Sequence, residues 1–305
     1  MSRTTKGDRA VNLTIRDMSK RYANGVQALD KVSLDVSPGM FGLLGPNGAG
    51  KSTLMRTLAT LQEADSGSAT LGSMDVLRDK DGVRRILGYL PQDFGLYPKV
   101  TANDMLDHFA RLKGISDASQ RKATVDALLE RTNLADVRHR ALGSFSGGMR
   151  QRFGIAQALI GNPQLIIVDE PTAGLDPEER VRFHNLLAGI GRETIVILST
   201  HIVDDVADLC PSFAVISKGR VLLSGSPEAN TRAIRGKIWR RTVAREAIEG
   251  VQKSLPIISS RPSGGEIVVH AYADSAPGAE FESAEPRLED VYFSAVAGHI
   301  ARPAA

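Results

Sequence analysis

The sequence predicts an α/β protein whose mostly parallel sheet is interrupted by helices, and three observations support this class. Continuous apolar runs with polar ends, at 40–44, 164–170 and 194–201, are typical of parallel strands that are covered on both faces. A glycine-rich turn joins the first run to a helical segment. A longer stretch of helical periodicity, from about 100 to 160, precedes the second run.

The first expected elements are strands. Residues 11–15 and 32–36 alternate between apolar and polar side chains, which is the period of a half-buried strand. Ala23-Asn24-Gly25 and Ser37-Pro38-Gly39 supply turn residues. An antiparallel β-piece is therefore expected before the glycine-rich turn.

The glycine-rich turn fits the pattern G-x-x-x-x-G-K-[ST], with a strand at 40–44 before it and a helix at 52–58 after it. In this context the backbone wraps a β-phosphate, Lys51 reaches the β- and γ-phosphates and Ser52 ligates Mg2+. A plain glycine-rich turn is the weaker interpretation. We therefore expect the chain to bind a nucleoside triphosphate through Gly45, Pro46, Asn47, Gly48, Ala49, Gly50, Lys51, Ser52 and Thr53.

Further elements follow the loop helix. Short strands are expected at 67–71 and at 86–92, where Gln92 stands at a strand end, the usual ligand-binding edge of an open α/β sheet. A hairpin is expected from 213–217 and 220–224. Beyond Gly225 the pattern predicts a small α+β appendage with strands at 237–243 and 266–270, a helix at 244–251, and a last helix at 287–293 that packs back on the appendage.

Two carboxylates mark the polar end of the strand at 165–168, which we expect to lie next to the phosphate loop. Asp169 would hold Mg2+, and Glu170 would orient and polarise an attacking water. The alternative is that both residues only solvate the end of a strand.

A specific resemblance follows from Phe145-Ser146-Gly147-Gly148-Met149-Arg150-Gln151-Arg152, which is similar to the signature sequence of ATP-binding-cassette (ABC) ATPases. It precedes a helix expected at 152–160, so its Ser-Gly-Gly turn is a second anion-binding site. Phe145 stands where the family usually has Leu. Because the aromatic ring is also apolar, we expect an intact site.

The other family landmarks occur in order, and the resemblance covers about residues 11–225. Tyr22 resembles the aromatic residue that stacks on adenine, although taken singly it reads better as a core residue. Gln92 resembles the glutamine that touches Mg2+ and the attacking water. Gly174-Leu175-Asp176 resembles the loop that crosses the dimer interface, and His201 the residue that contacts the γ-phosphate.

The resemblance implies an α/β P-loop NTPase fold with an ABC-type antiparallel β-subdomain and an inserted helical subdomain. The expected division is a flexible N-terminus at 1–10, an ABC ATPase domain at 11–225 with the helical subdomain at about 93–160, and a small C-terminal accessory domain at 226–305. The accessory domain at 226–305 could regulate the ATPase domain, mediate dimerisation or brace the ATPase domain.

The resemblance also implies the cofactors ATP and Mg2+ and a head-to-tail dimer with a second nucleotide-binding subunit, most simply a homodimer. The loop at 45–53 of one subunit and Ser146, Gly147 and Gly148 of the other would enclose one ATP. Closure of the dimer would energise a separate integral-membrane permease. Asp93–Pro98 would lie where the permease docks, or form an ordinary loop.

Three softer segments, 88–92, 200–206 and 286–293, resemble ATPase subunits of bacterial multidrug and antibiotic exporters. An importer ATPase is one alternative. A second alternative is an ABC ATPase that acts on nucleic acid or ribosomes, but the chain has one cassette, a short helical insert and a single cysteine, Cys210.

Composition limits the partners and the location. Among 305 residues, 38 basic and 35 acidic residues are interspersed and give a net charge of +3, so we expect no nucleic-acid partner. Cys210 alone forms no internal disulfide and is expected to be a small buried hydrophobe. No apolar run approaches the ~20 residues of a membrane span. We therefore expect a cytoplasmic protein that is peripheral on the inner face of the cell membrane.

Overall fold

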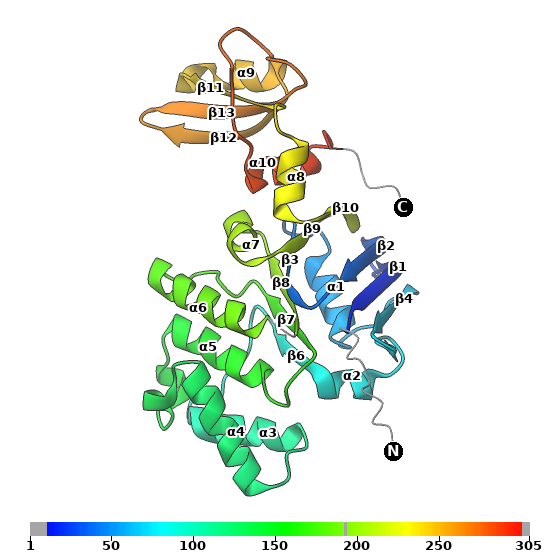
Figure 1. Ribbon diagram of the computed structural model, residues 1–305, viewed down its shortest axis with the longest axis vertical. Helices are drawn as coiled ribbons and strands as arrows, with labels where there is room; N and C mark the ends of the chain where they lie inside the picture. Colours follow the sequence, from blue (N-terminus) through cyan, green and yellow to red (C-terminus); the bar gives the residue numbers. More distant parts are fainter. Residues whose placement is uncertain (1–10, 192–193, 301–305) are drawn as a thin grey trace, which may run out of the picture.

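The computed structural model describes residues 11–191 and 194–300, and these residues contain three sheets. In Figure 1 a helical region lies at the bottom, two sheets lie side by side in the middle, and the third sheet lies at the top. The predicted flexible N-terminus, 1–10, lies outside the described residues. Across the described ranges, no helix combines the length and the apolar composition that crossing a membrane requires.

The central sheet has six strands in the order β10-β9-β3-β8-β7-β6. Pairing is parallel from β9 to β6, and β10 pairs antiparallel with β9 as the predicted hairpin. The strands are β3 (Gly39–Leu44), β6 (Leu87–Leu90), β7 (Leu165–Asp169), β8 (Ile195–Thr200), β9 (Ser212–Ser217) and β10 (Arg220–Gly225). This sheet confirms the α/β class.

The apolar runs of this sheet divide between two cores because successive side chains of a strand point to opposite faces. Leu165 and Ile167 pack on one face with α1 (Lys51–Leu58). Ile166 and Val168 pack on the other face with the second group of helices. These helices are α5 (Gly147–Ala158), α6 (Pro177–Ile190) and α7 (Val203–Leu209).

The predicted antiparallel β-piece is the sheet β2-β1-β4-β5, which covers α1. Asp79 caps the short helix that follows this sheet by accepting a hydrogen bond from the Gly82 amide at 2.9 Å. The elements are β1 (Leu13–Arg21), β2 (Gln27–Val36), β4 (Ser66–Leu71), β5 (Met74–Asp75) and α2 (Lys80–Ile86).

The helical region between β6 and β7 contains two helices besides α5. Each is capped by its preceding side chain, since Thr101 accepts a hydrogen bond from the Asp104 amide and Asp117 from the Gln120 amide. The elements are α3 (Ala102–Leu112), α4 (Ala118–Arg131) and the single turns η1 (Ala135–Val137) and η2 (Leu142–Ser144).

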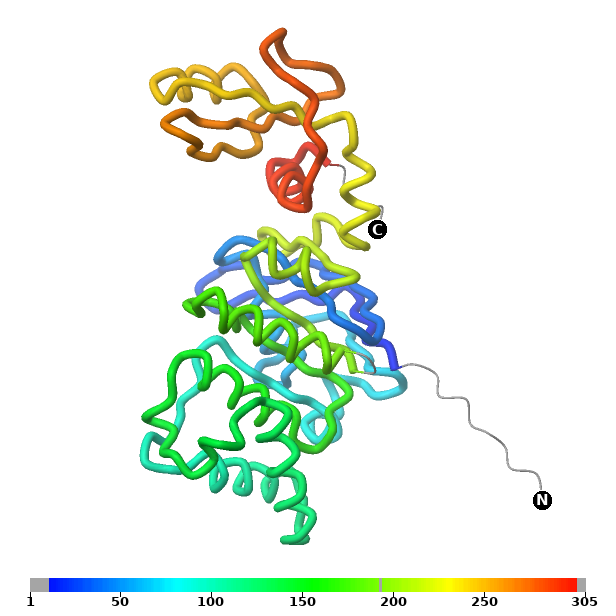
Figure 2. Tube along the Cα trace, turned by 60° about the vertical axis from the view of Figure 1, so that its left-hand side comes forward, coloured from blue at the N-terminus to red at the C-terminus, as the bar shows by residue number. Residues whose placement is uncertain are grey.

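Residues after Gly225 form the third sheet, in the order β12-β13-β11-β14, and its helices. One face packs on α9 through Val243, Val269 and Phe281. The predicted last helix, α10, lies between this sheet and the rest of the molecule (Figure 2) and contacts α7, α8 and β12. The elements are α8 (Pro227–Ala233), β11 (Ile238–Val243), η3 (Arg245–Ala247), α9 (Ile248–Ser254), β12 (Ile257–Ser263), β13 (Glu266–Tyr272), β14 (Glu282–Ser283) and α10 (Leu288–Val296).

The polar end of β7 lies next to the phosphate loop, as expected, because Glu170 Oε1 is 3.5 Å from Lys51 Nζ, although β8 lies between β7 and β3. One expectation was wrong. The signature helix begins at Gly147 rather than Arg152, because Ser146 caps it by accepting a hydrogen bond from the Met149 amide at 3.2 Å. Cys210 is 4% exposed, as expected, and burial raises the pKa of its thiol to about 12.

Candidate functional site

The phosphate-loop motif forms the turn between β3 and α1. Gly48 and Gly50 have φ angles of 76° and 108°, in the left-handed region that favours glycine. At Gly50 a Cβ would also lie 2.4 Å from the carbonyl oxygen of Ala28. Gly50 has no side chain to cap α1, so the first amides of this helix face the loop. This arrangement suits an anion at the start of α1.

Lys51 is the buried cation of the loop, with 6% of its surface exposed. Its Nζ donates hydrogen bonds to the carbonyl oxygens of Gly45 at 2.6 Å and Pro46 at 3.3 Å. The same nitrogen lies 3.5 Å from Glu170 Oε1. The ammonium group therefore stands between the phosphate loop and the polar end of β7, although β8 separates the two strands.

Glu170 follows β7 in an unusual backbone conformation, with a φ of 51°. Such an angle is uncommon in residues other than glycine and is found at functional sites. Two contacts hold it: its amide donates to the carbonyl oxygen of Ser199 at 2.8 Å, and its Oε2 lies 2.5 Å from His201 Nδ1. When Glu170 is ionised, the His201 ring carries its proton on Nδ1 to make this bond.

Asp169 is 4% exposed, and its Oδ1 has no hydrogen-bond partner within the described ranges. A buried oxygen of this kind normally has a partner, so it fits a water shell or a hard cation such as Mg2+. No group of three or more His, Cys, Asp and Glu side chains is placed to hold a metal ion in the described part of the chain. Mg2+ usually takes one or two carboxylates and completes its shell with phosphate oxygens and water.

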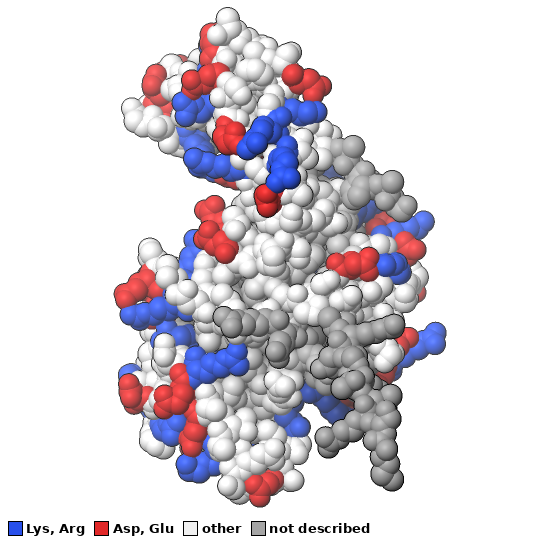
Figure 3. Space-filling model, viewed as in Figure 1, with Lys and Arg blue, Asp and Glu red and all other residues white. Residues whose placement is uncertain are grey.

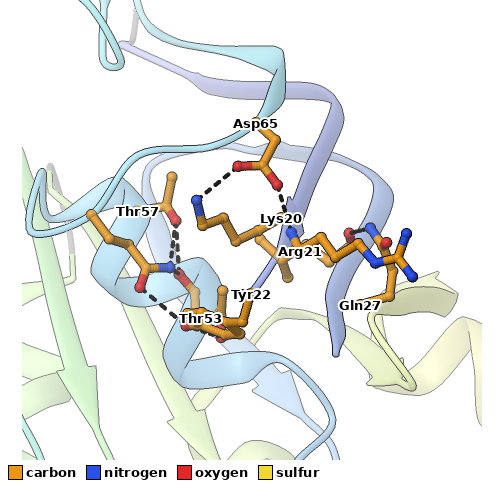
Figure 4. Close-up of polar contacts among 9 residues, drawn as sticks. Lys20, Arg21, Tyr22, Gln27, Thr53, Thr57 and Asp65 are labelled. Carbon is orange, nitrogen blue, oxygen red and sulfur yellow. Dashed lines mark hydrogen bonds and ion pairs between the residues drawn. The ribbon is translucent and has the colours of Figure 1, made fainter. Parts of the chain in front are cut away.

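Tyr22 follows β1 and lies beside the start of α1 (Figure 4). Its Oη is 3.1 Å from both Thr53 Oγ1 and Gln62 Oε1. Asp65 anchors the end of β1 by accepting hydrogen bonds from Lys20 Nζ at 2.7 Å and from the Arg21 amide at 2.6 Å. These two donors hold the pKa of the Asp65 carboxyl below its ordinary value.

Gln62 and Asp65 were not singled out from the sequence. Each is a common surface residue type without a motif around it, so the sequence offers no signal for their positions beside Tyr22 and β1.

The signature turn lies apart from the phosphate loop of the same chain, because α5 and α1 pack on opposite faces of the central sheet. A Cβ on Gly147 would meet no atom within 4 Å, whereas a Cβ on Gly148 would lie 2.1 Å from Glu179 Oε2. Phe145 is buried and packs edge-to-face on Phe153, with ring centroids 6.4 Å apart. The bulkier residue is thus accommodated in the core, and Ser146 and Gly147 remain exposed.

Two further predicted residues also lie apart from the loop. Asp176 caps α6, where its Oδ1 accepts a hydrogen bond from the Glu179 amide at 2.8 Å. Gln92 is exposed and lines a cavity of about 330 Å³ with Gly147 and Gln151. The structure therefore brings together the loop, Glu170, His201 and Tyr22, and Asp169 precedes Glu170 at the end of β7.

The surface shows no single-sign field on the face drawn in Figure 3, where Lys and Arg residues stand among Asp and Glu residues. This distribution matches the interspersed charges of the sequence.

Comparison with known proteins gives three results. A family model described as ABC transporter matches residues 29–173. The probable multidrug ABC transporter ATP-binding protein YbhF of Escherichia coli K12 is 31% identical over 306 residues, covering 94% of this chain and 52% of YbhF. The daunorubicin resistance ATP-binding protein DrrA3 of Streptomyces coeruleorubidus is 37% identical over 218 residues, covering 71% of this chain and 68% of DrrA3. The chain thus spans about half the length of YbhF.

A structural comparison agrees on the fold. The dimeric post-hydrolysis structure of the ATP-binding cassette MJ0796, bound to ADP and Pi, matches with a TM-score of 0.64 and 24% identity. The match covers 70% of this chain and 98% of that one.

Proposed function

This chain belongs to the ABC transporter family of ATP-binding proteins, and we propose that it binds and hydrolyses ATP to energise a transporter. The observation that carries the proposal is the convergence of Lys51, Glu170 and His201 on one phosphate loop. Because the chain covers about half of YbhF, the reaction, its substrates and its partners are proposed from this geometry.

The residues divide the work by position. The loop amides and Lys51 would bind the triphosphate, Tyr22 would stack on the base, and His201 would contact the γ-phosphate. Ser52 and Asp169 would hold Mg2+, which when bound neutralises charge on the transferred phosphoryl group, and Gln92, which lies apart from the loop in this structure, would have to move to join them. Glu170 would orient and polarise the attacking water, and its buried carboxylate is already placed between a lysine and a histidine.

A second copy of the chain would complete the site. Ser146 and Gly147 are exposed, and their helix packs on the face of the sheet opposite to α1, so they do not close their own phosphate loop. In a head-to-tail dimer, Ser146, Gly147 and Gly148 of each subunit would meet the triphosphate of the other, and Asp176 would lie at the interface. The structure of MJ0796 with ADP and Pi is described as dimeric.

Export is the direction we propose. YbhF is named as a probable multidrug protein and DrrA3 as a daunorubicin resistance protein. The partner would be an integral-membrane permease, with this chain peripheral on the cytoplasmic side and residues 226–305 as an accessory domain. Co-purification with a multi-span membrane protein is the expected result, whereas ATPase activity stimulated by DNA or ribosomes would favour a mechanical ATPase.

The substitution Glu170→Gln tests the catalytic proposal, because it keeps the shape of the side chain and removes its basicity. We expect ATP binding to persist, turnover to fall by about 100-fold or more, and an ATP-dependent dimer to accumulate. Steady-state ATPase assays and size-exclusion chromatography measure these outcomes. The exposed Glu130→Gln is the matched control and should hydrolyse ATP like the wild type. Near wild-type turnover in Glu170→Gln would show that the base is another residue.

A further inference from the structure

A buried carboxylate outside the proposed ATP site connects three segments of the cassette. Asp205, in α7, is 0% exposed, while its neighbour Asp204 is exposed. Its Oδ2 accepts a hydrogen bond from Thr172 Oγ1 at 2.6 Å. Its Oδ1 accepts from Arg180 Nε at 2.8 Å and from His184 Nε2 at 2.9 Å. Both oxygens of a fully buried carboxylate are therefore bound.

The three donors lie on either side of one loop. Thr172 comes two residues after Glu170, and Arg180 and His184 lie in α6, which begins just after Asp176. The loop between them, residues 173–176, includes Gly174-Leu175-Asp176. Asp205 thus holds the chain immediately before and after the segment that we place at the dimer interface.

The same carboxylate is tied to the catalytic histidine through its own helix. The helix α7 begins at Val203, two residues after His201, and His201 is bonded to Glu170. Glu170 and Thr172, at the start of the loop, are therefore bonded respectively to His201 and to Asp205. A shift of α7 would move both contacts together.

Stability alone is a weak reason for this arrangement. Burying a charged pair costs desolvation free energy, and well-packed apolar residues often stabilise a core as well or better. What a bound carboxylate adds is directional hydrogen bonds that fix the relative position of the segments it joins.

We propose that Asp205 is a positioning residue. It would hold the loop at 173–176 in position to contact the second subunit and would keep Glu170 and His201 in contact with each other. The inference rests on the proposed ATPase function. Asp205 acts through Thr172, Arg180 and His184 and has no role in binding ATP within one chain. Its loss therefore lowers the turnover of the dimer and leaves the affinity of the single chain for ATP intact.

Two matched pairs of variants test this in the full-length chain. Asp205→Asn removes the charge of the buried carboxylate, and Asp204→Asn makes the same change on the exposed surface of the same helix. Thr172→Val removes only the hydroxyl donor, and Thr172→Ser retains it. The second pair keeps the test decisive if Asp205→Asn fails to fold.

The readouts are the Kd for MgATP, the kcat and KM of ATP hydrolysis, and ATP-dependent dimer formation in a Glu170→Gln background. We expect kcat to fall by about tenfold or more in Asp205→Asn and Thr172→Val, because small misplacements of reacting groups are costly. The Kd of Asp205→Asn and Thr172→Val should stay within about threefold of the wild type. The controls Thr172→Ser and Asp204→Asn should keep the wild-type kcat. A purely structural residue would instead reduce binding and turnover together.

The outcomes separate this inference from the function on which it rests. If Lys51→Ala abolishes turnover while Asp205→Asn and Thr172→Val keep the wild-type kcat, the inference is overturned and the proposed function stands. Equal losses in Thr172→Val and Thr172→Ser also overturn it, since the hydroxyl is then irrelevant. Wild-type turnover in Lys51→Ala would overturn both.

Discussion

Two adjacent glycines in the signature turn have different physical reasons to be there. Gly148 faces the Glu179 carboxylate, which is also ion-paired with Arg152, and a Cβ at this position would collide with it. Gly147 has open space around it and a φ angle outside the left-handed region. Packing within a single chain thus gives a reason for glycine at 148 and none at 147, where the proposed contact with a second subunit would favour it.

The substitution Gly147→Asp separates these two requirements. A carboxylate in the first turn of α5 should stabilise the helix by ~0.3–1 kcal/mol through the helix dipole. The same charge would repel the triphosphate of a second subunit. We expect an unchanged or raised Tm, retained ATP binding, and turnover reduced by about 100-fold, as for the loss of one transition-state donor.

Thermal unfolding and steady-state ATPase assays check this prediction. Gly148→Ala is the comparison, and it should lower the Tm because its Cβ meets Glu179. Wild-type turnover in Gly147→Asp would contradict a role for this turn in the reaction.

At the scale of elements, close packing of α5 on the central sheet positions the signature turn. A Cβ on Gly88, in β6, would lie 2.2 Å from the carbonyl oxygen of Ala158, the last residue of α5. The helix that carries Ser146 and Gly147 at its start thus touches the sheet backbone at its end. This contact explains why β6 has glycine inside a buried strand.

The substitution Gly88→Ala should therefore push α5 away from the sheet. We expect it to destabilise the protein by about 1–3 kcal/mol, as overpacking does, and to lower turnover because the signature turn moves with the helix. Gly189→Ala is the control: Gly189 is exposed in α6 with no atom within 4 Å of its Cβ, so alanine should stabilise by ~0.5–1 kcal/mol. Denaturant unfolding measures the free energy of unfolding of both variants. Equal values for Gly88→Ala and Gly189→Ala would contradict the packing argument.

Local patterns predicted the elements whose stability comes from a clear apolar period. The runs at 40–44, 164–170 and 194–201 became β3, β7 and β8 because parallel strands bury both faces. The helix α2 was not predicted, since it buries only Val83 and depends on the Asp79 cap. The edge strand β12 was missed because it contains Pro262 and is largely exposed.

Long-range contacts determine the features of the fold and the site that local sequence patterns did not predict. The insertion of β8 between β3 and β7 depends on pairing between distant segments, which no local period encodes. In the site, the motif identified Lys51, Asp169 and Glu170, but the bonds of Asp205 join residues 21–33 positions apart. Spacing in the sequence cannot identify such partners.

At the scale of the whole molecule, α10 joins the third sheet, β12-β13-β11-β14, to the rest of the chain. Leu288, Val291 and Tyr292 pack in the same core as Val206 of α7. Asp290 connects the helix to the sheet, because its Oδ1 lies 2.7 Å from His270 Nδ1 on β13. Movements of the residues after 225 would therefore reach α7, which follows His201.

In the proposed dimer, each ATP site takes its phosphate loop from one chain and its signature turn from another. Mixing two defective variants tests this arrangement most directly. Lys51→Ala damages only the loop, and Gly147→Asp damages only the turn, so a mixed dimer would contain one site with both halves intact and one with both damaged.

We predict that each variant alone hydrolyses ATP at a small fraction of the wild-type rate. An equal mixture should recover about a quarter of the wild-type rate, because half of the dimers are mixed and each has one intact site. A mixture that stays as inactive as its two components would contradict a site shared between two chains.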